Sequence, residues 1–327
     1  MVKNMKSMPN TGRTIVLLNI LKEYSDESHR ISMPELIVYL EEAGYHADRR
    51  AVYASLEALK DAGYEIPFSR AGGKQGYYLV PKYSPSEILF LADAVRESPA
   101  LSKKATQELS RKLSGELSRY ERSALPVRAP SREKTTNNEV MRTIELLITA
   151  IASRHAVEFR YYDLTVRKEL RFRRSSGMYH LLPVSILSSG GRFYCVFYSA
   201  SHDSFANYRI DKMTNVRVTE EECDPVRFDA ERWEETSFMM YRGEPVTVSL
   251  VCDLSLANIV FDRFGTDLLI SEVTEKDFTV SIRTSLSPTL VSWILMFYDR
   301  ITVKAPEALK EELLAIADRI QSVYKKD

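Results

Sequence analysis

Residues Tyr179–Met213 contain three short apolar runs, at 180–187, 192–198 and 207–210. Gly190-Gly191 separates the first two runs, and a polar segment separates the last two. Short runs rich in β-branched and aromatic residues, bounded by such breakers, are typical of β-strands. This part of the chain is therefore expected to form a small antiparallel sheet. Its strands also carry more tyrosines and cations than folding requires, which indicates a binding surface.

Other strand and helix signals extend this sheet toward the N-terminus. A helix is predicted over 138–153, and the strand 157–162 follows it with Val157, Phe159 and Tyr161 on one face. The segment 167–174 is rich in arginine and lysine. Residues 138–222 are therefore interpreted as one domain with a small sheet and a cationic region.

The N-terminal third, residues 1–83, predicts three helices followed by a hairpin. The helices cover 13–24, a segment that starts after Ser32 and ends at Gly44, and 49–62. Ser32 with Glu35 forms a capping-box signal. The strands are expected at 65–69 and 76–80, with a tight turn at Gly72-Gly73. This order of elements predicts a winged helix-turn-helix.

The third helix and the hairpin carry side chains suited to DNA. Arg49 and Arg50 lie in the first helical turn, where the positive end of the helix also attracts phosphate. Tyr53 is one turn further along, at a position for base edges or sugar. Arg70, Lys74 and Gln75 of the hairpin can reach the backbone or the minor groove. The alternative is a protein-interaction module, because the acidic and basic residues of 1–83 almost cancel.

Length and composition limit the classes of protein to which the chain could belong. At 327 residues, two or three domains are expected. The 45 Lys and Arg balance the 45 Asp and Glu, which excludes a globally basic coat for nucleic acid. The three scattered cysteines argue against a disulfide framework and a structural zinc site, and a reducing cytoplasm is the simplest compartment. The N-terminus predicts neither a signal peptide nor a membrane span.

Two further regions complete the chain. Residues 84–137 predict a helical linker with helices at 84–97 and 102–125, whose leucines are expected at a dimer contact. Residues 223–327 predict the order βαββαβ, as in a ferredoxin-like split unit. The expected elements are strands at 246–251, 268–271, 278–284 and 301–303, with helices at 255–264, 288–297 and 306–324.

The motif DRRAVYASLEALKDAGYEI, followed by GGKQGYYLV, resembles the winged-helix half of bacterial WYL-domain transcription regulators. Ala51 stands where the family has Thr, and Ala54-Ser55 where it often has Arg-Asp. The resemblance implies a similar docking mode on DNA with a different sequence preference.

The patterns Y-x-x-x-P, GGRFYCVFYS and NYRIDKM resemble the WYL domain itself, with its tripeptide standing as Phe193-Tyr194-Cys195. In that family an SH3-like sheet is suggested to bind a small anionic or nucleic-acid-derived effector that tunes DNA binding. The positions carried over as effector-binding are Ser185, Tyr194, Arg209, Asp211 and Lys212. The alternative is that Arg209 and Asp211 form a structural ion pair among packed tyrosines. VTVSLVCDLSLANIVFDRFG resembles the family's C-terminal extension, which implies dimer exchange or closure over the ligand face.

The sequence therefore predicts an α+β multidomain protein with a winged helix-turn-helix head, a helical linker, an SH3-like WYL sheet and a ferredoxin-like extension. The expected function is a ligand-responsive transcriptional regulator, a homodimer on double-stranded DNA, with no cofactor, metal or membrane partner. A non-DNA adaptor and an enzyme acting on nucleotides are the alternatives. The second is disfavoured because the sequence has no nucleophile elbow, phosphate-binding glycine loop or HExxH motif.

Overall fold

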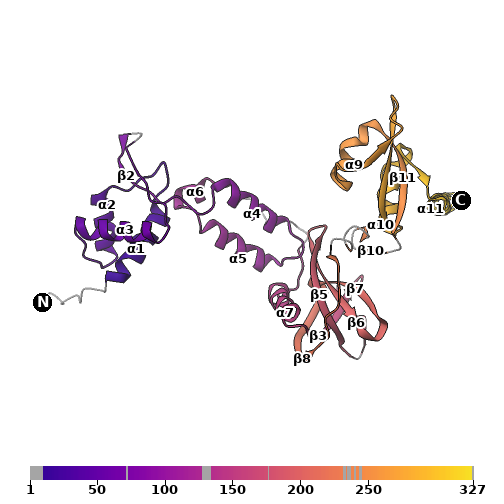
Figure 1. The fold of residues 1–327 in the computed structure, drawn as a ribbon, viewed down its shortest axis with the longest axis horizontal. Coiled ribbons are helices and arrows are strands. Elements are labelled where there is room, and N and C mark those ends of the chain that lie inside the picture. The colour runs from indigo at the N-terminus through magenta and orange to yellow at the C-terminus, as the bar shows by residue number, and fades with distance from the viewer. Residues whose placement is uncertain are drawn as a thin grey trace. The chain divides into compact units, whose positions relative to one another are not determined.

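The computed structural model describes residues 10–70, 73–126, 134–175, 177–230, 233, 237–238, 241–242 and 245–325. The chain divides into two compact units, Met1–Arg142 and Thr143–Asp327 (Figure 1). Ala71 and Gly72 of the predicted turn, and 127–133 of the predicted linker, lie outside the described residues.

The first unit begins with the head, residues 10–83, in which three helices precede a short hairpin. The elements are α1 (Asn10–Tyr24), α2 (Met33–Glu42), α3 (Arg49–Asp61), β1 (Phe68–Ser69) and β2 (Gly76–Tyr77). The capping box of Ser32 and Glu35 starts α2, and Asp48 caps α3 by accepting from the Ala51 amide. The helices bury one apolar core, which includes Leu17, Leu21, Leu36, Leu40, Val52 and Leu56.

The hairpin is shorter than predicted, since regular pairing is confined to 68–69 and 76–77. Pro67 has no amide hydrogen for the ladder, although the Val80 amide still donates to the Glu65 carbonyl at 2.9 Å. On its other side β2 bridges Ile31 through two backbone hydrogen bonds, each 2.9 Å. A Cβ on Gly76 would lie 2.6 Å from the Ile31 carbonyl oxygen, so only glycine allows this close approach.

The linker helices are α4 (Pro85–Glu97), α5 (Lys103–Ser114) and α6 (Arg119–Ala124). The single helix predicted over 102–125 is wrong, because it breaks after Ser114. Ser118 begins a new helix with a second capping box, in which its side chain accepts from the Glu121 amide and the Glu121 carboxylate accepts from the Ser118 amide. The start signal at Ser118 thus outweighs the continuous leucine spacing that favoured one helix.

The second unit holds a curled six-stranded sheet, which follows α7 (Val140–Ser153) along the chain. Its strands are β3 (His155–Leu164), β4 (Leu170–Phe172), β5 (Tyr179–Ser189), β6 (Arg192–Ser199), β7 (Ser204–Arg209) and β8 (Met213–Glu222). The path is β4-β3-β5-β6-β7, and β8 also pairs with β3. Phe159 is fully buried in its interior and packs against Tyr179, Phe197 and Tyr208 at centroid distances of 5.0–5.3 Å.

Two of these strands, β4 and β8, were not predicted. The acidic end of β8, Glu220–Glu222, has low strand propensity, and β8 is held by its pairing with β3. Long-range pairing therefore overrides local preference here.

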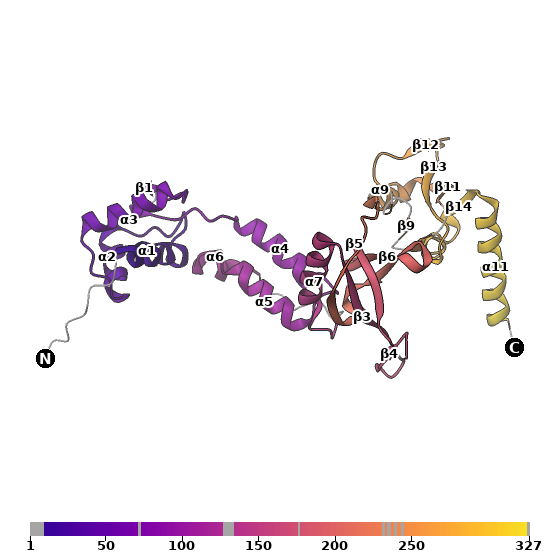
Figure 2. The ribbon, with the colours of Figure 1, turned by 60° about the horizontal axis from the view of Figure 1, so that its bottom comes forward.

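The C-terminal part forms a second, four-stranded sheet (Figure 2). Its elements are β11 (Pro245–Asp253), α9 (Ala257–Phe264), β12 (Leu269–Ser271), β13 (Asp277–Ser285), α10 (Pro288–Leu295), β14 (Ile301–Ala305) and α11 (Glu307–Tyr324). The strand order is β12-β13-β11-β14, with antiparallel neighbours. The short strands β9 (Ser237–Phe238) and β10 (Tyr241–Arg242) pair with each other. Within the described residues, no helix is long and apolar enough to cross a membrane.

Candidate functional sites

Helix α3 presents a polar face opposite its buried stripe. Val52, Leu56 and Leu59 pack into the core of the head, while Arg49, Arg50, Tyr53 and Glu57 are exposed. The two arginines occupy the first two positions after the cap, where the amide groups of the helix N-terminus face outward. Three of the predicted DNA-binding side chains thus share one exposed helix face.

Tyr53 also connects α3 with the hairpin. Burial raises the pKa of Tyr77 on β2 to about 12, and a side-chain hydrogen bond with Tyr53 adds to that increase. The phenol of Tyr53 is 44% exposed, so its ring remains accessible while its hydroxyl is engaged. Tyr53 therefore interacts with the hairpin through Tyr77.

The predicted DNA-binding residues of the hairpin are exposed, and two of them contact other side chains of the head. Lys74 Nζ donates to Glu35 Oε1 of α2 at 2.9 Å, with both side chains about half exposed. The guanidinium of Arg70 lies 5.8 Å from the Phe68 ring centroid, and Gln75 is exposed. The pair of Lys74 and Glu35 is a surface ion pair of the kind that contributes little to stability.

A polar network joins the head to the segment around α6. Ser118 Oγ donates to Asp26 Oδ2 at 2.8 Å, and Arg122 Nη2 donates to Glu23 Oε2 at 2.7 Å. The rings of His29 and Tyr120 stack at 3.7 Å. Burial raises the pKa of Asp26, but hydrogen bonds from Ser118 and His29 outweigh it and lower that pKa. The head and this segment are thus firmly connected within the first unit.

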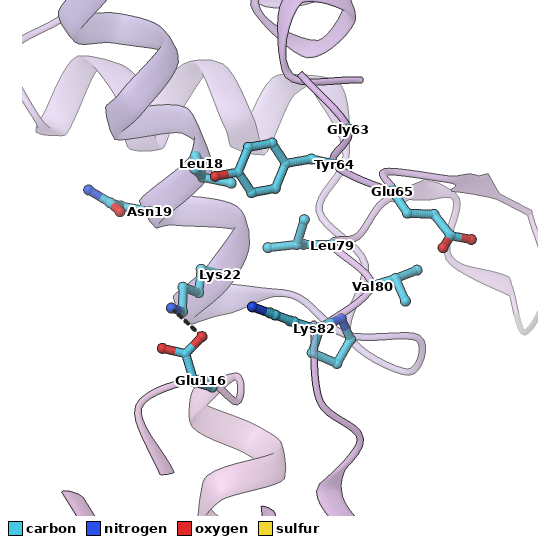
Figure 3. A pocket seen from close by; sticks show the side chains of 11 residues that line it. Leu18, Asn19, Lys22, Gly63, Tyr64, Glu65, Leu79, Val80, Lys82 and Glu116 are labelled. Atoms are coloured by element: carbon cyan, nitrogen blue, oxygen red, sulfur yellow. Dashed lines mark hydrogen bonds and ion pairs between the residues drawn. The ribbon is translucent and has the colours of Figure 1, made fainter. Parts of the chain in front are cut away.

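A pocket of about 510 Å³ lies beside this junction. Figure 3 shows the ammonium group of Lys22 directed toward Glu116, while Lys82 extends into the pocket from the other side, below Leu79 and Tyr64. Lys22 Nζ donates to Glu116 Oε2 at 3.0 Å across one end of the pocket. Glu65 also lines the pocket, so its two lysines and two glutamates cancel and the lining carries no excess of positive charge.

The sheet of the second unit holds two arginines on one buried carboxylate. Asp211 is 5% exposed and receives Arg209 Nε at 3.0 Å and Arg209 Nη2 at 2.7 Å. Arg192 Nη1 donates to the same carboxylate at 3.2 Å. Burial lowers the pKa of Arg209, but the hydrogen bonds to Asp211 outweigh it and raise that pKa. Asp211 therefore orients both guanidinium groups.

A second carboxylate holds two more cations. Lys212 Nζ donates to Asp163 Oδ1 at 2.9 Å, and Arg173 Nε donates to Asp163 Oδ2 at 2.8 Å. The hydrogen bond from Arg173 and then that from Lys212 hold the pKa of Asp163 well below its usual range. Burial raises the pKa of Tyr161 to about 12, and the charges of Arg173, Arg209 and Asp211 all act on its hydroxyl. The two clusters are therefore electrostatic neighbours around Tyr161.

Tyr194 and Ser185 lie on the strands next to these clusters. Tyr194 of β6 stands opposite Arg209 of β7, and Ser185 of β5 stands opposite Val196 of β6. Directly opposed residues share one face of a sheet, so Tyr194 and Arg209 lie side by side. We define the anion cluster as Arg192, Arg209, Lys212 and Arg173 with the carboxylates Asp211 and Asp163; its net charge is +2.

Sequence reasoning missed three members of this cluster. Arg192 directly follows the Gly190-Gly191 turn, a position that gave no functional signal. Arg173 belongs to the predicted cation-rich segment but was not singled out. Asp163 lies just past Tyr162, where the strand was predicted to stop, although β3 continues to Leu164. Their association depends on the register of β3, β6 and β7, which the local sequence does not encode.

A second pocket of about 510 Å³ opens near the ends of β5 and β8. Glu221, Glu222 and Asp224 line it, together with His180, whose Nε2 lies 2.7 Å from Glu221 Oε2. This acidic lining is unsuited to an anion, which separates it from the anion cluster.

Comparisons with known proteins concern the second unit most directly. Residues 142–218 match the family model of the WYL domain, and residues 244–321 match that of the WCX domain. The chain contains both domains. The WYL match covers most of the curled sheet and every residue of the anion cluster, and the WCX match covers the four-stranded sheet with most of α11.

Solved structures give a more distant likeness. One is proteasome accessory factor B/C (PafBC) of Arthrobacter aurescens, with 16% identity, a TM-score of 0.28, and 98% of this chain and 50% of that chain covered. Another is described as a CRISPR Cas-related protein, with 12% identity, a TM-score of 0.27, and coverages of 98% and 93%. The chain spans half the length of the PafBC chain. The comparison with curated proteins gave no match.

Proposed function

We propose that this protein is a DNA-binding transcriptional regulator whose WYL domain binds an anionic effector. The observation that carries the proposal is the exposed face of α3, which combines Arg49, Arg50 and Tyr53 beside a basic hairpin. The order of α1–α3 and the hairpin bridged to Ile31 supports a winged helix-turn-helix interpretation of the head.

In this interpretation α3 enters the major groove. Arg49 and Arg50 contact phosphates or base edges near the positive end of the helix, and Arg70, Lys74 and Gln75 lie along the adjacent backbone. Tyr53 has a second role, because its bond with Tyr77 keeps the hairpin at a fixed angle to α3. A homodimer would place two copies of α3 in successive major grooves of an inverted repeat.

The DNA proposal is tested by fluorescence anisotropy of the full chain with a duplex from upstream of its own gene and with a scrambled duplex. The double variant Arg49→Ala/Arg50→Ala is expected to bind roughly 10- to 100-fold more weakly. Lys103→Ala/Lys104→Ala is the matched control, since it removes two exposed cations from the first turn of α5. Equal binding by the arginine variant and the control would reject the assignment of α3.

At the sheet, the anion cluster offers four cations whose positions are set by two carboxylates. A phosphate or carboxylate ligand would bind to Arg209, Arg192 and Lys212 beside the Tyr194 hydroxyl. Asp211 is buried beneath the arginines, so its role in this proposal is to orient them rather than to contact the ligand. Lysine at position 212 supplies charge without the bidentate geometry of arginine.

The effector proposal predicts that Tyr194→Phe and Arg209→Ala change the response of DNA binding to the effector. The identity of material that co-purifies with the protein, determined by mass spectrometry, tests this directly. The proposal assigns the chain no catalytic activity. A chain that binds no duplex at any salt concentration, but captures a protein through its head, would instead be an adaptor.

A further inference from the structure

The outer face of the WYL sheet is partly covered by a segment that neither family model includes. Phe228, Ala230 and Trp233, here called the strap, follow β8 and precede the first residue of the WCX match. They pack with Leu187 and Val196 of β5 and β6, and Val196 is fully buried. The chain that leaves the sheet therefore returns across its surface before it enters the WCX domain.

The strap is attached to β7 by both packing and a hydrogen bond. The Trp233 indole Nε1 donates to Asn207 Oδ1 at 3.1 Å. Phe205, Phe228 and Trp233 form an aromatic trio with centroid distances of 5.2–5.7 Å. Trp233 is only 6% exposed, so the contact shields its indole from water.

The same face carries the effector positions. Asn207 stands opposite Val196, and Arg209 stands opposite Tyr194. Because residues two apart on a strand share a face, Asn207 and Arg209 lie on one side of β7, about 7 Å apart. Leu187, which packs in the Trp233 cluster, is the other cross-strand neighbour of Tyr194. The strap thus borders the Tyr194–Arg209 pair from two sides.

The contact between the strap and β7 matters because β7 lies at an edge of the sheet. Among the described strands, β7 is the last of the path and has β6 as its neighbour in the sheet. Edge strands are held less firmly than central ones, since one side of their backbone lacks a partner strand. The strap therefore adds to the other restraints on β7, which are its pairing with β6 and the hydrogen bond from the Arg209 amide to the Tyr161 hydroxyl at 3.2 Å.

We propose that the strap is a positioning element for the effector site. By fixing Asn207, Trp233 holds β7 in the register that places Arg209 beside Tyr194. Reciprocally, an anion bound at Arg209 steadies β7 and favours the docked strap, as linkage requires. This inference rests on the proposed effector site.

The experiment uses the full chain with inorganic pyrophosphate as the probe, titrated by isothermal calorimetry. Trp233→Ala is expected to weaken binding by about 5- to 20-fold, and Trp233→Phe by a smaller factor because it keeps the packing but loses the indole hydrogen bond. Trp293→Phe is the matched control, since it alters the chain's other tryptophan, which packs with Phe264 and Phe297 in the WCX domain. That control is expected to bind as the unsubstituted chain does.

Hydrogen exchange of the β7 amides supplies a readout that needs no ligand. Trp233→Phe and Trp233→Ala should speed exchange at 205–209 while leaving the amides of β3 unchanged. Unchanged exchange in β7, or unchanged pyrophosphate affinity in a folded Trp233→Ala variant, would overturn the strap inference and leave the effector site standing. If pyrophosphate fails to bind the unsubstituted chain while β7 exchange does depend on Trp233, the strap restrains β7 but the proposed anion site, and the linkage with it, is rejected.

Discussion

The cations of the head and those of the WYL sheet are arranged by opposite means. Arg49 and Arg50 project from α3 into solvent, positioned by the helix and its Asp48 cap. Arg209 and Arg192 are about three-quarters buried and share the buried carboxylate of Asp211. The first arrangement suits an extended polyanion, because exposed charges act at long range and are screened by salt. The second suits a small anion of defined shape, because each donor already points in a fixed direction.

The charged side chains of the two regions should also differ in how they affect binding and stability. Removing an exposed cation of the head should change binding with little effect on folding. Removing a cation or carboxylate of the sheet should affect folding, because it leaves a partly buried charge without its partner.

The largest effect is expected for Asp211→Ala. Two partly buried guanidinium groups would lose their shared carboxylate, which should lower the free energy of unfolding by roughly 2–3 kcal/mol. Urea denaturation followed by circular dichroism measures this change. A loss no larger than that of Arg49→Ala would show that the two regions do not differ as described.

The next largest effect is expected on the pH dependence of stability. The depressed pKa of Asp163 means that its contacts with Arg173 and Lys212 contribute stability above the unfolded pKa of about 4. That contribution is lost as pH falls through the lower, folded-state pKa. Stability measured from pH 6 down to pH 2 should therefore fall more steeply for the unsubstituted chain than for Asp163→Asn. Parallel curves for the two proteins would contradict the role of this carboxylate.

Within the head, Tyr53 and Tyr77 should act as one unit through their hydrogen bond. Tyr53→Phe and Tyr77→Phe are each expected to weaken duplex binding by about 1 kcal/mol, because either change frees the hairpin from α3. The double variant should be no weaker than the single ones, which a double-mutant cycle can measure. Additive losses would mean that each hydroxyl contacts DNA independently.

The smallest effect on stability is expected at the exposed pair of Lys74 and Glu35. Lys74→Ala should change the free energy of unfolding by less than about 0.5 kcal/mol, since both side chains are about half exposed. Duplex affinity should nevertheless fall several-fold. Lys212→Ala is the counterpart in the sheet, and thermal unfolding of the two variants should show the larger shift for Lys212.

Local signals accounted for much of the fold. Ser32 with Glu35 marks the start of the second helix, and the third helix was predicted from position 49; the structure begins both helices at these places. The strands of 179–209 follow the apolar runs bounded by Gly190-Gly191. These features depend on a few neighbouring residues, which is why the sequence alone could predict them.

The remaining features depend on contacts distant in the chain. Asp163 meets Lys212, and Arg192 meets Asp211, only after β3, β6 and β7 have paired in a particular register. Trp233 has no apolar pattern around it that predicts a return across the sheet. An ion pair between Arg209 and Asp211 was one of two interpretations of the sequence. The structure contains this ion pair at the proposed effector site.

The most direct test of the central claim is the salt dependence of duplex binding by the full chain. The account predicts that log Kd rises linearly with log salt concentration, with a slope set by the number of phosphates contacted. Arg49→Ala/Arg50→Ala should reduce that slope by about 2, while Lys103→Ala/Lys104→Ala leaves it unchanged. Binding that is independent of salt, or a slope equally affected by both double variants, would contradict the assignment of α3 as the DNA-contacting helix.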